Sequence, residues 1–217
     1  MRGKGNPAQP LIHSVRHGRR LRQGRARPGG LRENKEMMNR RVVVTGLGMV
    51  SPLGADLATS WRNALEGKSG VGRITAFDPS EFGCQIAGEV KDFDAAKYLG
   101  VKEVRRFDRF VHFGVAAGLM ALEDSGLEVT EQNAPMIGVA IGAGIGGLPS
   151  ICANNDAMVS RGPRRISPFM IPGCIINMAS GQLAIMKGLK GPNIAHVTAC
   201  STGLHAIGEA SYIIARG

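Results

Sequence analysis

The chain has 217 residues, of which 43% are hydrophobic and 20% charged, and its formal net charge is +10. Most of that charge lies in residues 1–38, where ten Lys and Arg outweigh two Glu for a net +8; the remainder has seventeen basic and fifteen acidic residues, a net +2. The nearly neutral remainder gives no reason to expect a nucleic-acid partner. No apolar run is long enough to span a membrane, so we expect no membrane partner either.

Residues 1–38 form a basic tail with few large apolar residues and no periodicity, so we expect it to be disordered. Arg19-Arg20 could open a twin-arginine export signal, but no apolar core follows and export is rejected. Two interpretations stay open. An organelle transit peptide would also be rich in Arg and poor in acids. A start-site artefact is favoured, because Met37-Met38 immediately precedes the first structured residues.

The first predicted elements are a strand, a helix and a mixed region. Residues 41–48 form a β-branched run closed by glycines, which predicts a buried strand. Asp56 can cap a helix that runs to about Leu65. Glycines recur through residues 67–100, which predicts loops with one short strand near 85–90.

The rest of the chain alternates helices with strands. In chain order we expect a helix over 102–122 stopped by Ser125-Gly126, a strand over 136–141, a helix from Ser167-Pro168 to about Lys187, a strand over 194–199 and a helix over 202–215. This alternation predicts a parallel, layered α/β sheet. Because the chain has only three such strands and stops as its last helix ends, we expect a sequence that is cut short.

The most informative segment is residues 193–208, in which a short apolar strand ends at Cys200 and a helix starts at once. A cysteine at such an elbow faces the helix N-terminus, whose partial positive charge favours thiolate, the nucleophilic form. Its neighbours Ala199, Ser201 and Gly203 are small, so a bulky acyl substrate could approach the sulfur. The leading hypothesis is acyl transfer through a thioester on Cys200. The alternative is an inert, buried cysteine.

Two further patterns argue against a metal site and against a dinucleotide-binding site. The four cysteines are too widely spaced for a CxxC metal site or a dense disulfide framework, so we expect no metal and reduced thiols in a cytoplasmic protein. Gly142-x-Gly144-x-x-Gly147 matches the dinucleotide fingerprint, which also needs an acid about 20 residues later, but residues 157–208 hold no Asp or Glu. The favoured interpretation of these glycines is tight backbone packing near a pocket.

The remaining candidates are histidines and basic residues. His196 and His205 flank Cys200, but neither is spaced to act as its base, and satisfied structural histidines are the favoured interpretation. Two groups of basic residues are either solvated faces or a docking site for an acidic carrier; they are Lys102, Arg105 and Arg106 on one predicted helix, and Arg164 with Arg165.

Four segments, in order along residues 40–217, resemble β-ketoacyl-acyl carrier protein synthases, and most closely the synthase II type of bacterial type II fatty acid synthesis. They are residues 41–54 (RVVVTGLGMVSPLG), 141–147 (IGAGIGG), 162–169 (GPRRISPF) and 191–203 (GPNIAHVTACSTG). One departure is His196, which stands where the family usually has an apolar residue.

The resemblance implies an α/β, thiolase-like, layered αβαβα fold of two similar halves, of which residues 39–217 would supply the N-terminal half only. It implies an acyltransferase, usually a homodimer, with no metal or organic cofactor. The reaction would be the decarboxylative Claisen condensation of fatty acid elongation, in which acyl- and malonyl-loaded acyl carrier proteins are the partners. The family's catalytic histidines and lysine belong to the second half, so none is assigned here.

The resemblance also implies roles for individual residues. Cys200 would be the nucleophile, and its backbone N–H would be one donor to the oxyanion. Ile145 would gate the acyl pocket, and Phe169 and Met170 would reach the acyl pocket of the partner subunit. The basic residues that would dock the carrier are Lys102, Arg105, Arg106, Arg164 and Arg165. Two alternatives stay open: a polyketide-type ketosynthase, and a truncated non-catalytic fragment that only dimerises or binds carrier protein.

Overall fold

The computed structural model describes residues 40–217. The predictions for the basic tail, including its disorder and the start at Met37-Met38, lie outside the described residues. Within the described range, no helix is long and apolar enough to cross a membrane.

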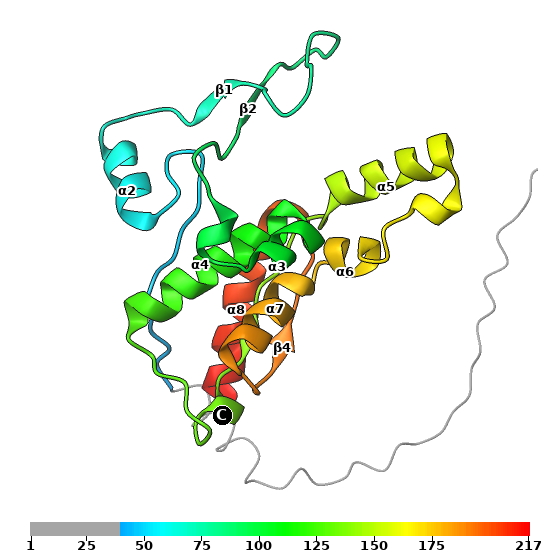
Figure 1. Ribbon diagram of the computed structural model, residues 1–217. Helices are drawn as coiled ribbons and strands as arrows, with labels where there is room; N and C mark the ends of the chain where they lie inside the picture. The colour runs from blue at the N-terminus through cyan, green and yellow to red at the C-terminus, as the bar shows by residue number, and fades with distance from the viewer. Residues whose placement is uncertain (1–39) are drawn as a thin grey trace, which may run out of the picture.

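Helices dominate the described part of the chain (Figure 1). The α-helices are α2 (Leu57–Leu65), α3 (Val101–Arg106), α4 (Arg109–Ser125), α5 (Leu148–Arg161), α6 (Met170–Cys174), α7 (Met178–Lys187) and α8 (Thr202–Arg216). The 3-10 turns are η1 (Ala95–Lys97), η2 (Ala134–Met136), η3 (Pro163–Arg165) and η4 (Ala199–Ser201). The strands are β1 (Val71–Arg73), β2 (Ile86–Gly88), β3 (Val139–Ala140) and β4 (Asn193–Ile194).

The centre of the fold is a short parallel pair of strands. β3 and β4 pair with Val139 opposite Asn193 and Ala140 opposite Ile194, and the long crossover between them contains α5, α6 and α7. Both α7 and α8 contact β3, and α4 packs on α7. The predicted parallel α/β arrangement is therefore confirmed.

The packing of α4 on α7 forms the core, and small residues make it possible. A Cβ added at Gly114 would lie 3.0 Å from the Cβ of Ala179, and one at Gly118 would overlap the Leu183 side chain. Val111 and Val115 of α4 are fully buried in the adjoining hydrophobic cluster, which they form with Leu99. The small residues let the two helices approach closely, since any larger side chain at the two glycines would hold them apart.

Two helix boundaries agree with the sequence signals. The Asp56 carboxylate accepts the Thr59 N–H at 2.7 Å and caps α2 as predicted, and this backbone hydrogen bond lowers the pKa of Asp56. Gly126 ends α4 with a φ of 65°, in the left-handed region that glycine adopts without steric cost. The short strand expected near residues 85–90 is β2, which pairs antiparallel with β1.

The predicted strand over residues 41–48 is wrong, because this segment belongs to no strand. A strand needs a neighbour for its backbone hydrogen bonds, and none of the described residues supplies one. The segment instead lies along α4, where Leu47 N–H donates to Asp124 Oδ2 at 2.8 Å and Gly48 approaches the Ala117 carbonyl. Val43 remains 69% exposed.

Two predicted helices are each broken into two. The helix expected over 102–122 is divided into α3 and α4 at Phe107, which has extended backbone angles. The helix expected from Ser167-Pro168 to Lys187 starts later, at Met170, and is interrupted at Ile175. Hydrophobic periodicity continues through each break between helices, so the sequence pattern alone does not mark it.

The two predicted central strands, β3 and β4, are shorter than expected, and α5 was not predicted.

Candidate active site

Cys200 lies in η4, between β4 and the first residue of α8. The strand-to-helix elbow predicted around this cysteine is confirmed, although the strand ends five residues earlier than expected. The thiol is exposed and free, so the interpretation as a buried cysteine is wrong for this structure. Within residues 40–217 its sulfur makes no hydrogen bond to protein, which leaves it open to a reaction partner.

A network of three hydrogen bonds shapes the elbow. The Thr202 hydroxyl accepts the Thr198 N–H at 2.9 Å and donates to the Ala199 carbonyl at 2.8 Å, and the Ser201 N–H donates to the Thr198 carbonyl at 2.9 Å. Among non-glycine residues in the described range, Ala199 alone has a positive φ, at 47°. Such a conformation costs about 1–2 kcal/mol, so these hydrogen bonds stabilise a strained backbone next to the thiol. Neither threonine was among the residues predicted for the site.

The glycine-rich segment at residues 142–147 packs against this elbow. A Cβ at Gly142 would overlap the His196 carbonyl oxygen, and one at Gly144 would lie 3.4 Å from the Ala199 carbonyl oxygen. The interpretation of these glycines as sites of tight backbone packing is therefore confirmed. A signal for the contact was present in the sequence, namely two small-residue segments that each follow a predicted strand of one parallel sheet.

The two histidines near Cys200 contact each other. The ring centroids of His196 and His205 are 4.4 Å apart, and His205 Nδ1 lies 3.4 Å from the Thr198 hydroxyl. His196 Nδ1 is buried without a hydrogen-bond partner among the described residues. The prediction of a satisfied structural histidine is thus wrong for His196, because its Nδ1 makes no hydrogen bond although it is buried. Neither ring is hydrogen-bonded to Cys200.

The three residues expected at the acyl pocket lie on two segments. Ile145 lies in the glycine-rich segment and is 70% exposed. Phe169 precedes α6 and Met170 is its first residue. Neither Phe169 nor Met170 is hydrogen-bonded to the elbow. The contact of α6 with the segment of Ile145 lies at the other end of the helix, where the Gly147 N–H donates to the Cys174 carbonyl at 2.9 Å.

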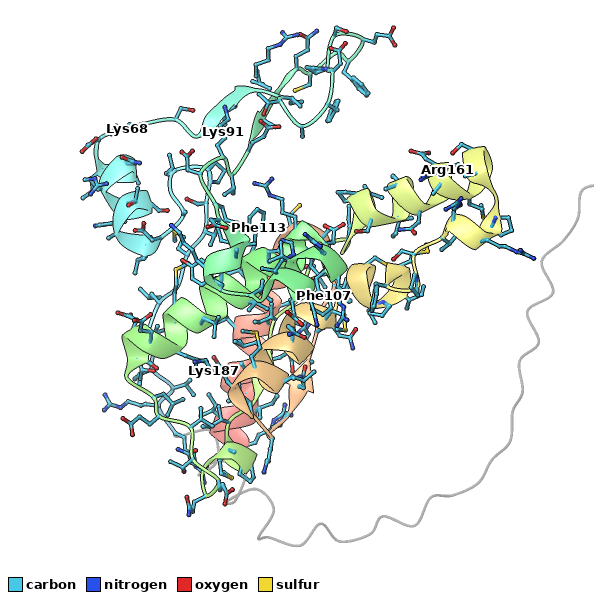
Figure 2. All side chains as sticks on the ribbon, viewed as in Figure 1. Lys68, Lys91, Phe107, Phe113, Arg161 and Lys187 are labelled. Atoms are coloured by element: carbon cyan, nitrogen blue, oxygen red, sulfur yellow. The ribbon has the colours of Figure 1, made fainter. Side chains whose placement is uncertain are left out.

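The five basic residues expected to dock a carrier are all exposed, and they lie on two separate elements. Lys102, Arg105 and Arg106 belong to α3, and Arg164 and Arg165 to η3. α3 packs on α6, whereas η3 follows α5, whose last residue, Arg161, lies at the far end of a projecting arm (Figure 2). The helical spacing that would place the α3 residues on one face is confirmed.

His112 is a buried residue of α4. Burial lowers the pKa of His112 from its usual 6.5, and this effect exceeds the opposing attraction of Asp108 one turn earlier. His112 Nε2 also has no hydrogen-bond partner among the described residues. Across residues 40–217, no three His, Cys, Asp or Glu side chains cluster in a way that could hold a metal ion.

Comparison with known proteins agrees with this architecture. Residues 39–217 match the family described as beta-ketoacyl synthase, N-terminal domain. The 3-oxoacyl-[acyl-carrier-protein] synthase 2 of Vibrio harveyi is 55% identical over 181 residues, which are 83% of this chain and 44% of that protein. The protein of the same name from Coxiella burnetii is 59% identical over 179 residues, 82% of this chain and 43% of that protein. The chain thus spans less than half the length of these relatives.

Two solved structures have a similar fold. A beta-ketoacyl synthase from Burkholderia phymatum matches with a TM-score of 0.70 and 26% identity, over 82% of this chain and 44% of that one. A type II PKS ketosynthase in complex with its acyl-carrier protein, bound to the hexaketide, matches with a TM-score of 0.67 and 26% identity, over 83% of this chain and 49% of that one. The chain therefore has a thiolase-like fold and belongs to the β-ketoacyl synthase family, whose N-terminal domain it matches.

Proposed function

We propose that residues 39–217 are the N-terminal half of a 3-oxoacyl-acyl carrier protein synthase that elongates fatty acids. The observation that carries the proposal is Cys200, an exposed thiol in a hydrogen-bonded elbow directly before the 15-residue helix α8. The identity of 50–59% to three relatives named synthase 2 supports the same activity.

The elbow suits the first half-reaction. The Cys200 thiol loses its proton, and the thiolate attacks the thioester carbonyl of an acyl carrier protein. A new thioester forms on the sulfur as the bond to the carrier's sulfur breaks, and the carrier's thiolate leaves and takes up the proton that Cys200 lost. The backbone N–H of Cys200, in the turn η4 before α8, is one donor to the developing oxyanion. Malonyl carrier protein then loses CO₂, its carbanion attacks the Cys200 thioester, and the thiolate is regenerated.

The other predicted residues have supporting roles in the proposal. Ile145 gates the acyl pocket next to the elbow, and Phe169 and Met170 reach toward the acyl pocket of a second subunit. The exposed basic residues of α3 and η3 bind an acidic carrier protein, which is supported by the similar ketosynthase structure that contains its own acyl-carrier protein. We also propose that the protein forms a homodimer and is located in the cytoplasm.

A polyketide-type ketosynthase is the second candidate, because one similar structure is a type II PKS ketosynthase. That structure is 26% identical to this chain, whereas the synthase 2 relatives reach 59%, which favours fatty acid elongation. The third possibility is a chain that only dimerises or binds carrier protein.

Intact-mass spectrometry of the 217-residue chain after incubation with a long-chain acyl carrier protein tests the proposal. We expect a mass gain of one acyl group in the wild type and in Cys152→Ala, an exposed cysteine in α5, and no gain in Cys200→Ala. An equal gain in Cys200→Ala would reject the assignment of the nucleophile. No gain in the wild type would favour a non-catalytic role.

A further inference from the structure

Asp108 is a buried acidic residue at the point where three helices meet, and the reaction described above does not use it. It precedes α4, is 7% exposed, and makes no side-chain hydrogen bond to its own helix. Its Oδ2 instead accepts the Ser150 N–H in the first turn of α5 at 2.9 Å, and its backbone N–H donates to the Gly173 carbonyl in α6 at 3.1 Å. Asp108 therefore ties α4, α5 and α6 together.

The basic helix α3 is joined to the same point. α3 ends at Arg106, two residues before Asp108. The Arg106 backbone packs so closely on α6 that a Cβ at Gly173 would lie 2.7 Å from the Arg106 carbonyl oxygen, and the Arg106 guanidinium lies 4.6 Å from the centre of the Phe169 ring. Packed contacts of this kind do not deform continuously, so α3 and α6 have a fixed relative position.

The segment of Ile145 is held at both ends, and Asp108 holds one of them. A Cβ at Gly147 would lie 2.9 Å from Asp108 Cβ and 3.0 Å from its Oδ2, and the Gly147 N–H donates to the Cys174 carbonyl at 2.9 Å. At the other end, Gly144 packs on Ala199 in the elbow. The exposed Ile145 side chain thus lies between Asp108 and the residue before Cys200.

We propose that Asp108 is a positioning residue for acyl loading: it fixes the Ile145 segment and Phe169 relative to the basic face of α3. A carrier docked on α3 then delivers its acyl chain past Ile145 to Cys200 along one defined path. This inference rests on the proposed function. It adds that Asp108 determines how the docking surface on α3 is positioned relative to the Cys200 thiol. Geometry matters here because displacements of about 1 Å can cost up to 100-fold in rate.

The test measures single-turnover acylation of Cys200 as a function of acyl carrier protein concentration, together with carrier-independent alkylation of Cys200 by iodoacetamide. For Asp108→Ala we expect the rate at saturating carrier to fall about tenfold, while the half-saturating concentration stays within about twofold. Asp108→Asn keeps an oxygen that can accept the Ser150 N–H, so its saturating rate should stay within about threefold of wild type. Alkylation should be unchanged in both variants.

Three results would overturn the inference: a wild-type saturating rate in Asp108→Ala, a loss in Asp108→Asn as large as in Asp108→Ala, or a parallel loss of alkylation, which would mean that Asp108 only supports the fold. Each of these leaves the proposed function intact, because the wild type still acylates. A wild-type chain that is alkylated but never acylated would reject the proposed function, and the positioning role with it.

Discussion

The Thr202 hydroxyl accepts a hydrogen bond from the Thr198 amide at 2.9 Å and so closes the turn that carries Cys200. The same hydroxyl donates to the Ala199 carbonyl, which fixes the residue with the left-handed backbone. Thr202 is buried whereas Thr198 and Ala199 are exposed, so water replaces these bonds only in part if the hydroxyl is removed.

Replacing Thr202 with valine should destabilise the elbow. Thr202→Val keeps the shape of the side chain but leaves the Thr198 N–H and the Ala199 carbonyl without their partner, so we expect the free energy of unfolding to fall by about 1–3 kcal/mol. Urea denaturation measures this change. Thr202→Ser, which keeps the hydroxyl, is the control and should stay within about 0.5 kcal/mol of wild type; equal losses in both variants would show that the methyl group matters instead.

Gly142 should tolerate no side chain. In Gly142→Ala the new Cβ would overlap the backbone carbonyl of His196, so the two segments must separate, and we expect a loss of about 1–3 kcal/mol in the free energy of unfolding. Gly208 in α8 has open space around its Cβ position, and Gly208→Ala should raise stability by about 0.5–1 kcal/mol. A thermal melt of both variants checks the contrast, and a neutral Gly142→Ala would contradict the described contact.

His112 should make stability depend on pH. Its lowered pKa means that the unfolded chain binds this proton more readily than the folded one. Above pH 6.5, the pKa of His112 in the unfolded chain, the imidazole is neutral in both states and stability is at its full value. As pH falls from 6.5 toward the lowered pKa of the folded state, the free energy of unfolding decreases progressively. Urea denaturation from about pH 5 to about pH 8 should show this slope in the wild type, and His112→Gln should flatten it. An unchanged slope in His112→Gln would assign the pH dependence to other groups.

Charge reversal on α3 should weaken binding of the carrier. In Arg105→Glu an exposed cation becomes an anion, and we expect the half-saturating concentration of acyl carrier protein in Cys200 acylation to rise about tenfold at low salt and less at high salt. The matched control is Lys187→Glu, at the opposite end of α7 from α6 (Figure 2). A similar rise in both variants would show a general effect of net charge rather than docking on α3.

The sequence predicted a helix end correctly where a residue at that end itself caps or stops the helix. Asp56 and Gly126 are such residues, and the elbow at Cys200 followed from an apolar run that meets a helix at small residues. The wrong strand at residues 41–48 shows the limit of this approach, because β-branched residues indicate an extended chain but not a partner for it.

The site could be predicted only in part, since tertiary contacts determine the rest. The break between α3 and α4 depends on hydrogen bonds of Asp108 to Gly173 and Ser150, which are 65 and 42 residues away. The contact of His196 with His205 depends on how the strand and helix pack, which spacing along the chain does not give. Asp108 therefore had no sequence signal as a functional candidate.

The most direct test of the central claim is to map the acyl group within the chain. Trypsin cleavage after Lys190 and Arg216 releases residues 191–216 as one peptide that contains Cys200 and no other cysteine. After incubation with acyl carrier protein, we predict that this peptide alone carries an acyl thioester, which hydroxylamine removes. An acyl group on the peptides of the exposed Cys84 or Cys152, with residues 191–216 unmodified, would contradict the assignment of Cys200 as the nucleophile.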